Sequence, residues 1–433
     1  MNVELINTGS ELMLGRVLNT HQQWLCRRLA DLGYIVTRQV AVADTGRDIE
    51  TVVREALSRA DLIITTGGLG PTSDDITRQL IAELLGKKLH EDAAVVRHIE
   101  QFFASRKRPM PHSTRVQALI PEGAIVLANP HGTAPGLAIK IGDRRWEMGG
   151  GTQISPTSIS DLPSPKWLIM LPGPPRELRP MFDTSVVPLL QRSLPLAGGY
   201  ICRNLRTCGV GESVAEEKIG ELLKPLIAQG LDLGYCARVG QVDIRLASGG
   251  EHGAELVRQG EAIVREQLGK HIFGENDDEL EGVIVRLLTE RKQTLALAES
   301  CTGGGIANRI TNIPGASAVL LASLVTYANT SKQKFAGVRA ETLAMHGAVS
   351  EAVAREMAEG ARRETGADYA LSVTGIAGPG GGSDVKPVGT VFMALASSQD
   401  TVVLKQFNPF DRETFKNVTG TQVLELLRRQ LIK

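Results

Sequence analysis

The sequence lacks an excess of charge of either sign and lacks any long apolar run. Its 433 residues include 48 Lys+Arg and 48 Asp+Glu, so the formal net charge is zero. This neutral balance argues against a protein whose main partner is nucleic acid or an anionic membrane surface, so we expect neither kind of partner. No window approaches the roughly 20 unbroken apolar residues that a membrane-spanning helix requires.

Cysteine is also scarce. The chain has five cysteines, an odd number, and they are scattered with no CxxC pair. This pattern argues against a disulfide framework and against a thiolate zinc site, and it suits a reducing cytoplasm. The first residues read MNVELINTGSEL, with no basic region followed by an apolar one. We therefore expect a mature end, no signal peptide and a cytoplasmic protein.

Short apolar runs alternate with amphipathic stretches in the first part of the chain. The pattern predicts strands at Val3–Asn7, Tyr34–Val42 and Asp61–Gly68, and helices at Thr20–Leu32 and Asp48–Ser58. Strands that alternate with helices predict an α/β fold with a mostly parallel sheet covered on both faces. Such sheets bind ligands at the carboxyl ends of their strands, where glycine-rich turns occur in this chain.

The length predicts two to four domains at roughly 100–200 residues per domain. We expect an α/β domain over residues 1–183, a small α+β domain over 197–276 and a second α/β domain over 280–433. The stretch at 147–165 is rich in Gly, Ser and Pro without apolar periodicity. It is predicted to be a surface loop or insertion.

The first chemistry-bearing segment is Thr65–Asp75, which reads TTGGLGPTSDD. An apolar strand enters a glycine-rich turn whose backbone N–H groups can cradle a phosphate or another anion, and Ser73 or Asp74 can cap the following helix. The alternative is a tight turn with a simple helix cap. Two further glycine–proline turns, Asn129–Gly136 and Leu171–Phe182, follow strands, and three such loops can build one anion pocket.

Together with Asn7–Leu25, these segments resemble the molybdopterin-binding-like domain of the competence/damage-inducible CinA family over about Met1–Phe182. The resemblance implies a three-layer α/β domain, which in some family members is a metal-dependent ADP-ribose pyrophosphatase. Paired carboxylates at Asp74 and Asp75 suit a hard divalent cation beside a diphosphate. The alternative for Asp75 is a solvated carboxylate in the first turn of a helix. By this resemblance, the site is lined by Gly67, Gly68, Gly70, Thr72, Asp74 and Asp75.

The sharpest segment is Leu295–Ile310, which reads LALAESCTGGGIANRI. A predicted strand ends at Glu299, and Ser300, Cys301, Thr302 and three glycines lead into a helix. A hydroxyl at such a turn is exposed, and the N–H groups after it point to where an oxyanion or phosphate would sit. The alternative is that Ser300 or Thr302 is a plain helix cap.

A serine nucleophile needs a base, and no nearby histidine supplies one. Lys332, in VTYANTSKQK, is the candidate, because a desolvated lysine beside a serine can take its proton. The alternative is an ordinary solvated lysine at the surface. Cys301 is a competing nucleophile next to Ser300, but no histidine partner is evident for it.

A third block, Ser372–Gly382, is another glycine-rich loop at a strand end and contains Thr374. In this order, the three blocks resemble the CinA C-terminal domain, the PncC-type nicotinamide mononucleotide amidohydrolase family, over about Leu280–Lys433. The two resemblances together cover essentially the whole chain.

The resemblance implies that Ser300 is the nucleophile and that Lys332 and Tyr327 are the proton-handling pair. Thr374 would hold the substrate or orient the serine, and Arg412 would contact phosphate, although the chain has FDR where the family has GDR. The implied substrate-binding residues are Thr302, Gly303, Gly304, Gly375, Gly378 and Arg412.

The sequence therefore predicts a bifunctional enzyme of pyridine-nucleotide salvage. The C-terminal domain would convert nicotinamide mononucleotide to nicotinate mononucleotide and ammonia without a metal, and the N-terminal domain would cleave ADP-ribose with a divalent metal. The alternative is a non-catalytic nucleotide-binding protein tied to competence or DNA-damage responses. Molybdopterin handling rests on fold similarity alone. The family resemblance also implies a homodimer.

Overall fold

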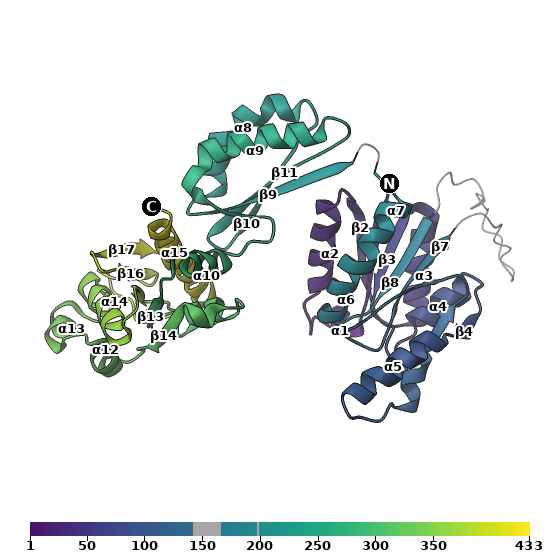
Figure 1. Cartoon of the computed structure of the whole chain (residues 1–433), viewed down its shortest axis with the longest axis horizontal. Coiled ribbons are helices and arrows are strands. Elements are labelled where there is room, and N and C mark those ends of the chain that lie inside the picture. The colour runs from purple at the N-terminus through teal and green to yellow at the C-terminus, as the bar shows by residue number, and fades with distance from the viewer. Residues whose placement is uncertain (142–165, 197–198) are drawn as a thin grey trace. The chain divides into compact units, whose positions relative to one another are not determined.

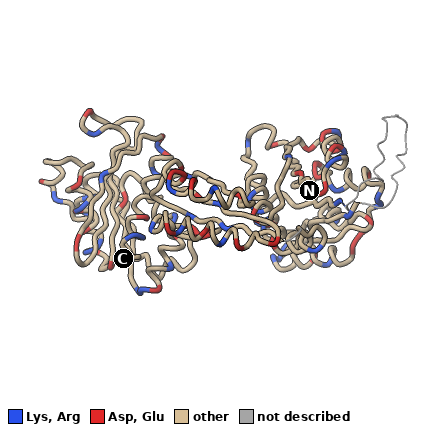
Figure 2. The backbone as a smooth tube through the Cα atoms, turned by 90° about the horizontal axis from the view of Figure 1, so that it is seen from above, with Lys and Arg blue, Asp and Glu red and all other residues tan. Residues whose placement is uncertain are grey.

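The computed structural model describes residues 1–141, 166–196 and 199–433 (Figure 1). The chain divides into two compact units. The first comprises Met1–Ile201 with Gly249–Glu251, and the second comprises Cys202–Ser248 with His252–Lys433. The loop or insertion predicted at 147–165 lies outside the described residues. Within the described residues, no helix is long and apolar enough to cross a membrane. Basic and acidic residues are interspersed along the backbone, as Figure 2 shows.

The first unit contains a six-stranded sheet, and the sequence correctly predicted its mostly parallel character. Strands β2, β1, β3 and β8 are parallel to one another, whereas β7 pairs antiparallel with both β8 and β6. Strands β1, β3 and β8 are buried along their whole length, as strands covered on both faces must be. In spatial order the strands are β2 (Val36–Val42), β1 (Val3–Thr8), β3 (Leu62–Thr66), β8 (Lys166–Leu171), β7 (Gly136–Ile141) and β6 (Ile125–Leu127).

Helices cover both faces of this sheet and give three layers (Figure 1). Side chains of α3, α4 and α5 form one apolar cluster with one face, and side chains of α2, α6 and α7 form another with the opposite face. Neighbouring residues of β1 alternate between the clusters, Leu5 in one and Ile6 in the other. The helices are α1 (Ser10–Met13), α2 (Thr20–Asp31), α3 (Gly46–Arg59), α4 (Thr77–Leu84), α5 (Ala93–Ser105), α6 (Pro175–Met181) and α7 (Val187–Ser193).

The second unit begins with a small α+β part. Its four-stranded sheet has the order β10–β11–β9–β12, with β10 antiparallel to β11 and β12 antiparallel to β9. Two helices supply one apolar cluster against this sheet. The elements are β9 (Tyr200–Cys208), α8 (Glu212–Ile227), β10 (Asp232–Arg238), β11 (Gln241–Gly249), α9 (Gly253–Leu268) and β12 (Ile272–Glu275).

The remainder of the second unit is a five-stranded sheet with helices on both faces. Strands β14, β13 and β15 are parallel, and β16 and β17 continue the sheet antiparallel. The strands are β13 (Leu295–Glu299), β14 (Leu320–Val325), β15 (Tyr369–Gly375), β16 (Thr390–Ala396) and β17 (Thr401–Phe407). The helices are α10 (Leu280–Arg291), α11 (Gly305–Thr311), α12 (Asn329–Ala336), α13 (Ala340–His346), α14 (Glu351–Thr365) and α15 (Arg412–Leu431).

Two packing details of this unit matter below. Helices α12 and α14 approach so closely that a Cβ atom at Gly360 would lie 1.7 Å from the carbonyl oxygen of Ala336, so only glycine fits there. Cys208 and Phe273 of the small α+β part belong to the same apolar cluster as α10, β13 and α15. The two parts of the second unit therefore share a core.

Candidate active site

The turn after β13 presents Ser300 at the carboxyl end of a central parallel strand. The N–H group of Ser300 donates to the carbonyl oxygen of Val373 in neighbouring β15 at 3.1 Å, which anchors the turn to the sheet. Gly303 and Gly304 then adopt φ angles of 64° and 92°, a left-handed conformation that favours glycine. Helix α11 begins directly afterwards, at Gly305. The glycines thus allow a sharp strand-to-helix turn beside the serine.

Lys332, on α12, lies against this turn and is buried, with 1% of its surface exposed. Its Nζ atom lies 2.8 Å from Ser300 Oγ and donates to the carbonyl oxygens of Thr326 at 2.7 Å and Tyr327 at 3.4 Å. Burial lowers the pKa of this lysine from its ordinary value, because the charged form loses hydration. A lysine held in this way is suited to accept the proton of the adjacent hydroxyl. The alternative of a solvated surface lysine is wrong.

Tyr327 and Arg412 meet at the edge of this site. The hydroxyl of Tyr327, a residue 60% exposed, accepts a hydrogen bond from Arg412 Nη2 at 2.8 Å. Arg412 Nη1 donates to the carbonyl oxygen of Gly378 at 2.9 Å. Arg412 therefore ties the loop after β15 to the segment that leads into α12. Lys332 contacts the carbonyl oxygen of Tyr327, whereas the Tyr327 hydroxyl bonds to Arg412, so the proton-handling role of Tyr327 stays a prediction.

Two further predicted residues of this site, Thr374 and Thr302, are buried. The hydroxyl of Thr374 donates to the carbonyl oxygen of Ala348 at 2.7 Å. The hydroxyl oxygen of Thr302 has no hydrogen-bond partner among the described residues. The N–H group of Gly303 donates to the carbonyl oxygen of Ser300 at 3.1 Å. Gly375 ends β15.

Glu299 is a residue whose role the sequence did not indicate. Its buried carboxylate accepts hydrogen bonds from the N–H groups of Gly304, Ile306 and Ala307 at the start of α11. The alternative in which Ser300 or Thr302 caps this helix is therefore wrong: Gly304 is the N-cap residue, and the capping oxygens come from Glu299. A glutamate at the end of an otherwise apolar buried strand was the available signal.

Cys301 has the surroundings of an unreactive thiol. Its side chain belongs to the apolar cluster around α10 and α15, and burial raises its pKa to about 12. Since the thiolate is the nucleophilic form of cysteine, a thiol of this kind is almost entirely unreactive at neutral pH. The geometry favours Ser300 over its neighbour.

The first unit has its own cavity, of about 420 Å³, at the carboxyl ends of β1, β3 and β8. All three predicted loops line it, including Gly67, Gly68 and Gly70 of the first loop. The left-handed Gly68 is required there, since a Cβ atom would overlap the Thr77 side chain. The carboxylate residues at this cavity are Glu11, Asp44, Asp74, Asp75 and Glu177, of which only Asp74 and Asp75 were predicted.

The predicted helix cap in this loop is wrong. Helix α4 begins at Thr77 after Ile76 and has no side-chain cap. Asp75 folds back, and its carboxylate accepts hydrogen bonds from the N–H and hydroxyl groups of Thr72. Within the described ranges, no three acidic, histidine or cysteine side chains converge closely enough to hold a metal by themselves. Asp74 and Asp75 both line the cavity, and their metal-binding role stays a prediction.

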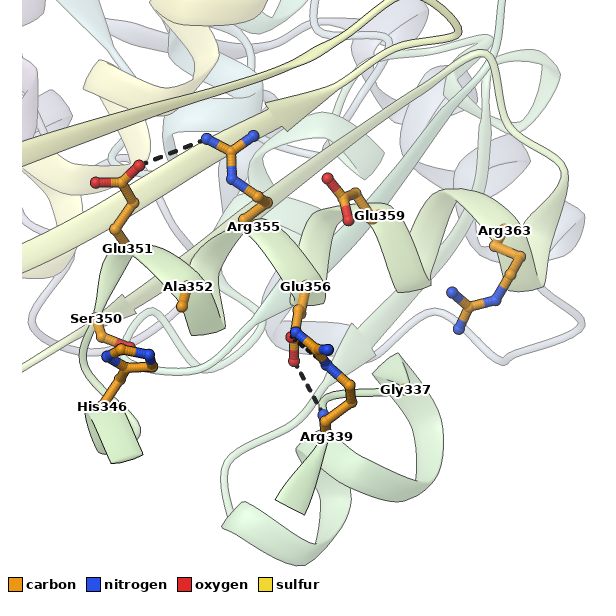
Figure 3. A pocket seen from close by; sticks show the side chains of 10 residues that line it. All are labelled: Gly337, Arg339, His346, Ser350, Glu351, Ala352, Arg355, Glu356, Glu359 and Arg363. Carbon is orange, nitrogen blue, oxygen red and sulfur yellow. Dashed lines mark hydrogen bonds and ion pairs between the residues drawn. The ribbon is translucent and has the colours of Figure 1, made fainter. Parts of the chain in front are cut away.

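A larger cavity, of about 640 Å³, lies between α13 and α14 and contains none of the predicted site residues (Figure 3). Its charged side chains largely pair with one another. Arg339 donates to Glu356 through its guanidinium and its backbone N–H, and Arg355 pairs with Glu351. We regard this cavity as separate from the chemistry at Ser300.

Three family models match consecutive parts of the chain. Residues 4–192 match the probable molybdopterin binding domain, residues 202–274 match the damage-inducible protein CinA KH domain, and residues 277–431 match the CinA C-terminal domain.

Known proteins are similar over the full length. A CinA-like protein of Akkermansia muciniphila is 42% identical over 98% of this chain and 96% of that protein. A CinA-like protein of Kosmotoga olearia is 39% identical over 100% of this chain and 99% of that protein. The crystal structure of the competence/damage inducible protein CihA from Agrobacterium tumefaciens is 40% identical, covering 36% of this chain and 94% of that one, with a TM-score of 0.35.

Proposed function

Because the chain belongs to the CinA family, we propose that its C-terminal part hydrolyses the carboxamide of nicotinamide mononucleotide to nicotinate mononucleotide and ammonia. The observation that carries this proposal is the contact of 2.8 Å between Ser300 Oγ and the buried Lys332 Nζ. A serine activated in this way attacks acyl carbons, and an aromatic carboxamide offers such a carbon.

The reaction begins when Ser300 Oγ bonds to the amide carbon while its proton passes to Lys332 Nζ. Collapse of the tetrahedral intermediate breaks the carbon–nitrogen bond, and Lys332 returns the proton to the leaving nitrogen, so ammonia departs. Water then attacks the acyl-enzyme ester with Lys332 again as the base, which releases the carboxylate and restores Ser300. Donors in the turn stabilise the oxyanion of both intermediates.

The remaining predicted residues would recognise the nucleotide. Arg412 would pair with the phosphate, because a guanidinium suits a phosphate geometrically. It would also fix Tyr327 at the entrance, to which it is hydrogen bonded. Thr374 would hold the loop Gly375–Gly378 in place through its bond to Ala348.

We further propose a cytoplasmic homodimer.

For the N-terminal part, we propose a metal-dependent ADP-ribose pyrophosphatase. Asp74 and Asp75 would hold a divalent cation together with the substrate diphosphate, whose charge the cation would neutralise. The glycine-rich loop of Gly67 and Gly68 would bring backbone N–H groups close to the phosphates. Glu11 and Asp44 line the same cavity and would orient the attacking water.

The second candidate function is nucleotide binding without turnover. The burial of Lys332 argues against it, since a lysine that only binds an anion gains nothing from desolvation or from contact with a serine hydroxyl.

The test is to incubate the purified protein with nicotinamide mononucleotide and to measure ammonia and nicotinate mononucleotide. Both products should appear in equal amounts with the wild type and be absent with Ser300→Ala. If the wild type binds the nucleotide but releases no ammonia, the binding function replaces the enzymatic one.

A further inference from the structure

Glu299 is the last residue of β13 and directly precedes Ser300, and both oxygens of its carboxylate accept hydrogen bonds. Its side chain is 1% exposed. One carboxylate oxygen accepts the N–H groups of Gly304 at 3.0 Å and Ile306 at 3.1 Å, and the other accepts that of Ala307 at 2.9 Å. The hydroxyl of Ser323, on β14, lies 3.4 Å from the second oxygen. A carboxylate is an acceptor-only group with two oxygens, so it matches this set of donors.

These contacts close the turn that contains Ser300. The backbone of Glu299 belongs to β13, where it pairs with Val373 of β15, and its side chain binds the start of α11. The four residues from Ser300 to Gly303 span the gap between the two attachments. The position of Ser300 Oγ relative to Lys332 thus depends on how firmly α11 is held to the end of β13.

The same contacts restrict where a substrate oxygen can bind. The N–H groups of Gly304, Ile306 and Ala307 are taken by Glu299, and those of Gly303 and Gly305 are taken by carbonyl oxygens within the turn. The two N–H groups that precede them in the turn are those of Cys301 and Thr302, and they are not among the donors to Glu299.

We propose that Glu299 is a positioning residue: it holds the turn so that Ser300 Oγ faces Lys332. This inference rests on the proposed role of Ser300 as nucleophile. It does not depend on which amide is the natural substrate.

The test uses chemical rescue of Glu299→Ala. This variant keeps Cβ and leaves a space of about the size of acetate, still lined by the N–H donors. Misplacing a reacting group by about 1 Å costs on the order of a hundredfold in rate. We expect kcat for nicotinamide mononucleotide to fall by about that factor with KM little changed. Millimolar formate or acetate should raise kcat of this variant at least about tenfold, while chloride at equal ionic strength should not.

A second measurement reports the reactivity of Ser300 without hydrolysis of the amide. An alkyl fluorophosphonate forms a bond from Ser300 Oγ to phosphorus and expels fluoride, and the serine proton passes to Lys332. Labelling should be slow in Glu299→Ala and recover with formate. The matched control is Glu356→Ala. Glu356 lies on α14, away from the turn, and its carboxylate likewise accepts hydrogen bonds, from the backbone N–H of Arg339 and the hydroxyl of Thr342. It should lower thermal stability without changing kcat or labelling.

The outcomes separate the two proposals. If the wild type is labelled at Ser300 but does not hydrolyse nicotinamide mononucleotide, the proposed substrate is wrong, and the labelling rates still decide the role of Glu299. Full activity or full labelling in Glu299→Ala overturns the inference, as does a loss that neither formate nor acetate reverses in a folded variant. If the wild type is never labelled, Ser300 is not an activated serine, and the inference about Glu299 is overturned as well.

Discussion

Arg412 donates a hydrogen bond of 2.8 Å to the hydroxyl of Tyr327, and these residues are 85 positions apart in the chain. The contact joins the first turn of α15 to the segment between β14 and α12. The backbone of Tyr327 in turn accepts a hydrogen bond from Lys332. The residue expected to bind phosphate is therefore linked through one tyrosine to the residue expected to move the proton.

This link gives the first prediction. Tyr327→Phe removes the acceptor of Arg412 but keeps the backbone carbonyl that Lys332 contacts. We expect KM for nicotinamide mononucleotide to rise about tenfold, on the scale of one charge-assisted hydrogen bond, with a smaller change in kcat. Steady-state kinetics measure both constants. A large fall in kcat at unchanged KM would instead assign the Tyr327 hydroxyl to proton transfer.

The second prediction concerns the nucleophile and its base. Ser300→Ala and Lys332→Ala should each lower the deamidation rate by at least about a thousandfold, and the double variant should cost little more, because residues that act as one unit are not additive. Cys301→Ala should retain most activity, since that thiol is buried. An active Ser300→Ala enzyme that a thiol reagent inactivates would reverse the assignment.

The third prediction is a pH dependence. Burial lowers the pKa of Lys332 below 10.5, and only the neutral amine can accept a proton. The rate constant kcat/KM should therefore be full above the lowered pKa and fall as the pH decreases through it, with a midpoint below 10.5. A pH profile of ammonia release measures this limb. A rate that rises as the pH decreases would exclude Lys332 as the base.

The fourth prediction separates the two halves. Chelator and Asp75→Asn should each abolish ADP-ribose cleavage, while deamidation survives both treatments. Since Asp75 also accepts hydrogen bonds from Thr72, the variant alone could act through the loop, so the chelator result decides whether a metal is used. ADP-ribose cleavage that withstands chelator would contradict the predicted metal.

The fifth prediction concerns fragments. A fragment of residues 276–433 should fold and deamidate, but it lacks Phe273 and Cys208 from its core and the carbonyl of Lys270 that accepts from Arg428. Losing a buried aromatic costs about 3–5 kcal/mol. Urea unfolding should show the fragment less stable than residues 202–433 by roughly this amount. Equal stabilities would mean that the shared core contributes little.

Much of the second unit could be predicted from periodicity alone. The apolar patterns of the sequence predict helices at Leu280–Arg291 and Arg412–Leu431 and strands at Tyr369–Gly375, Thr390–Ala396 and Thr401–Phe407. The bounds of α10, α15, β15, β16 and β17 agree with them. In the first unit, α3 begins two residues before the predicted start because Thr45 caps it. The helix predicted after the three glycines is α11, whereas α12, a short helix of eight residues, was not predicted.

The candidate site was only partly predictable. Ser300 and Lys332 could be paired because their residue types fit one chemistry, although 32 positions separate them. The contacts of Glu299 and the Arg412–Tyr327 bond could not be predicted, because they depend on how α11 and α15 pack on the sheet. Asp75 was expected to face a metal, and its carboxylate accepts hydrogen bonds from Thr72 of its own loop, which only the backbone path could reveal.

The close approach of Gly360 to Ala336 links the candidate site to a position outside it. Ala336 lies one turn after Lys332 on α12, so a single methyl group at position 360 would push this helix outward as a rigid rod. A Gly360→Ala variant would thereby withdraw the lysine from the serine, although the substituted atom touches neither. Loss of activity in a natural variant therefore does not require a change at the site itself.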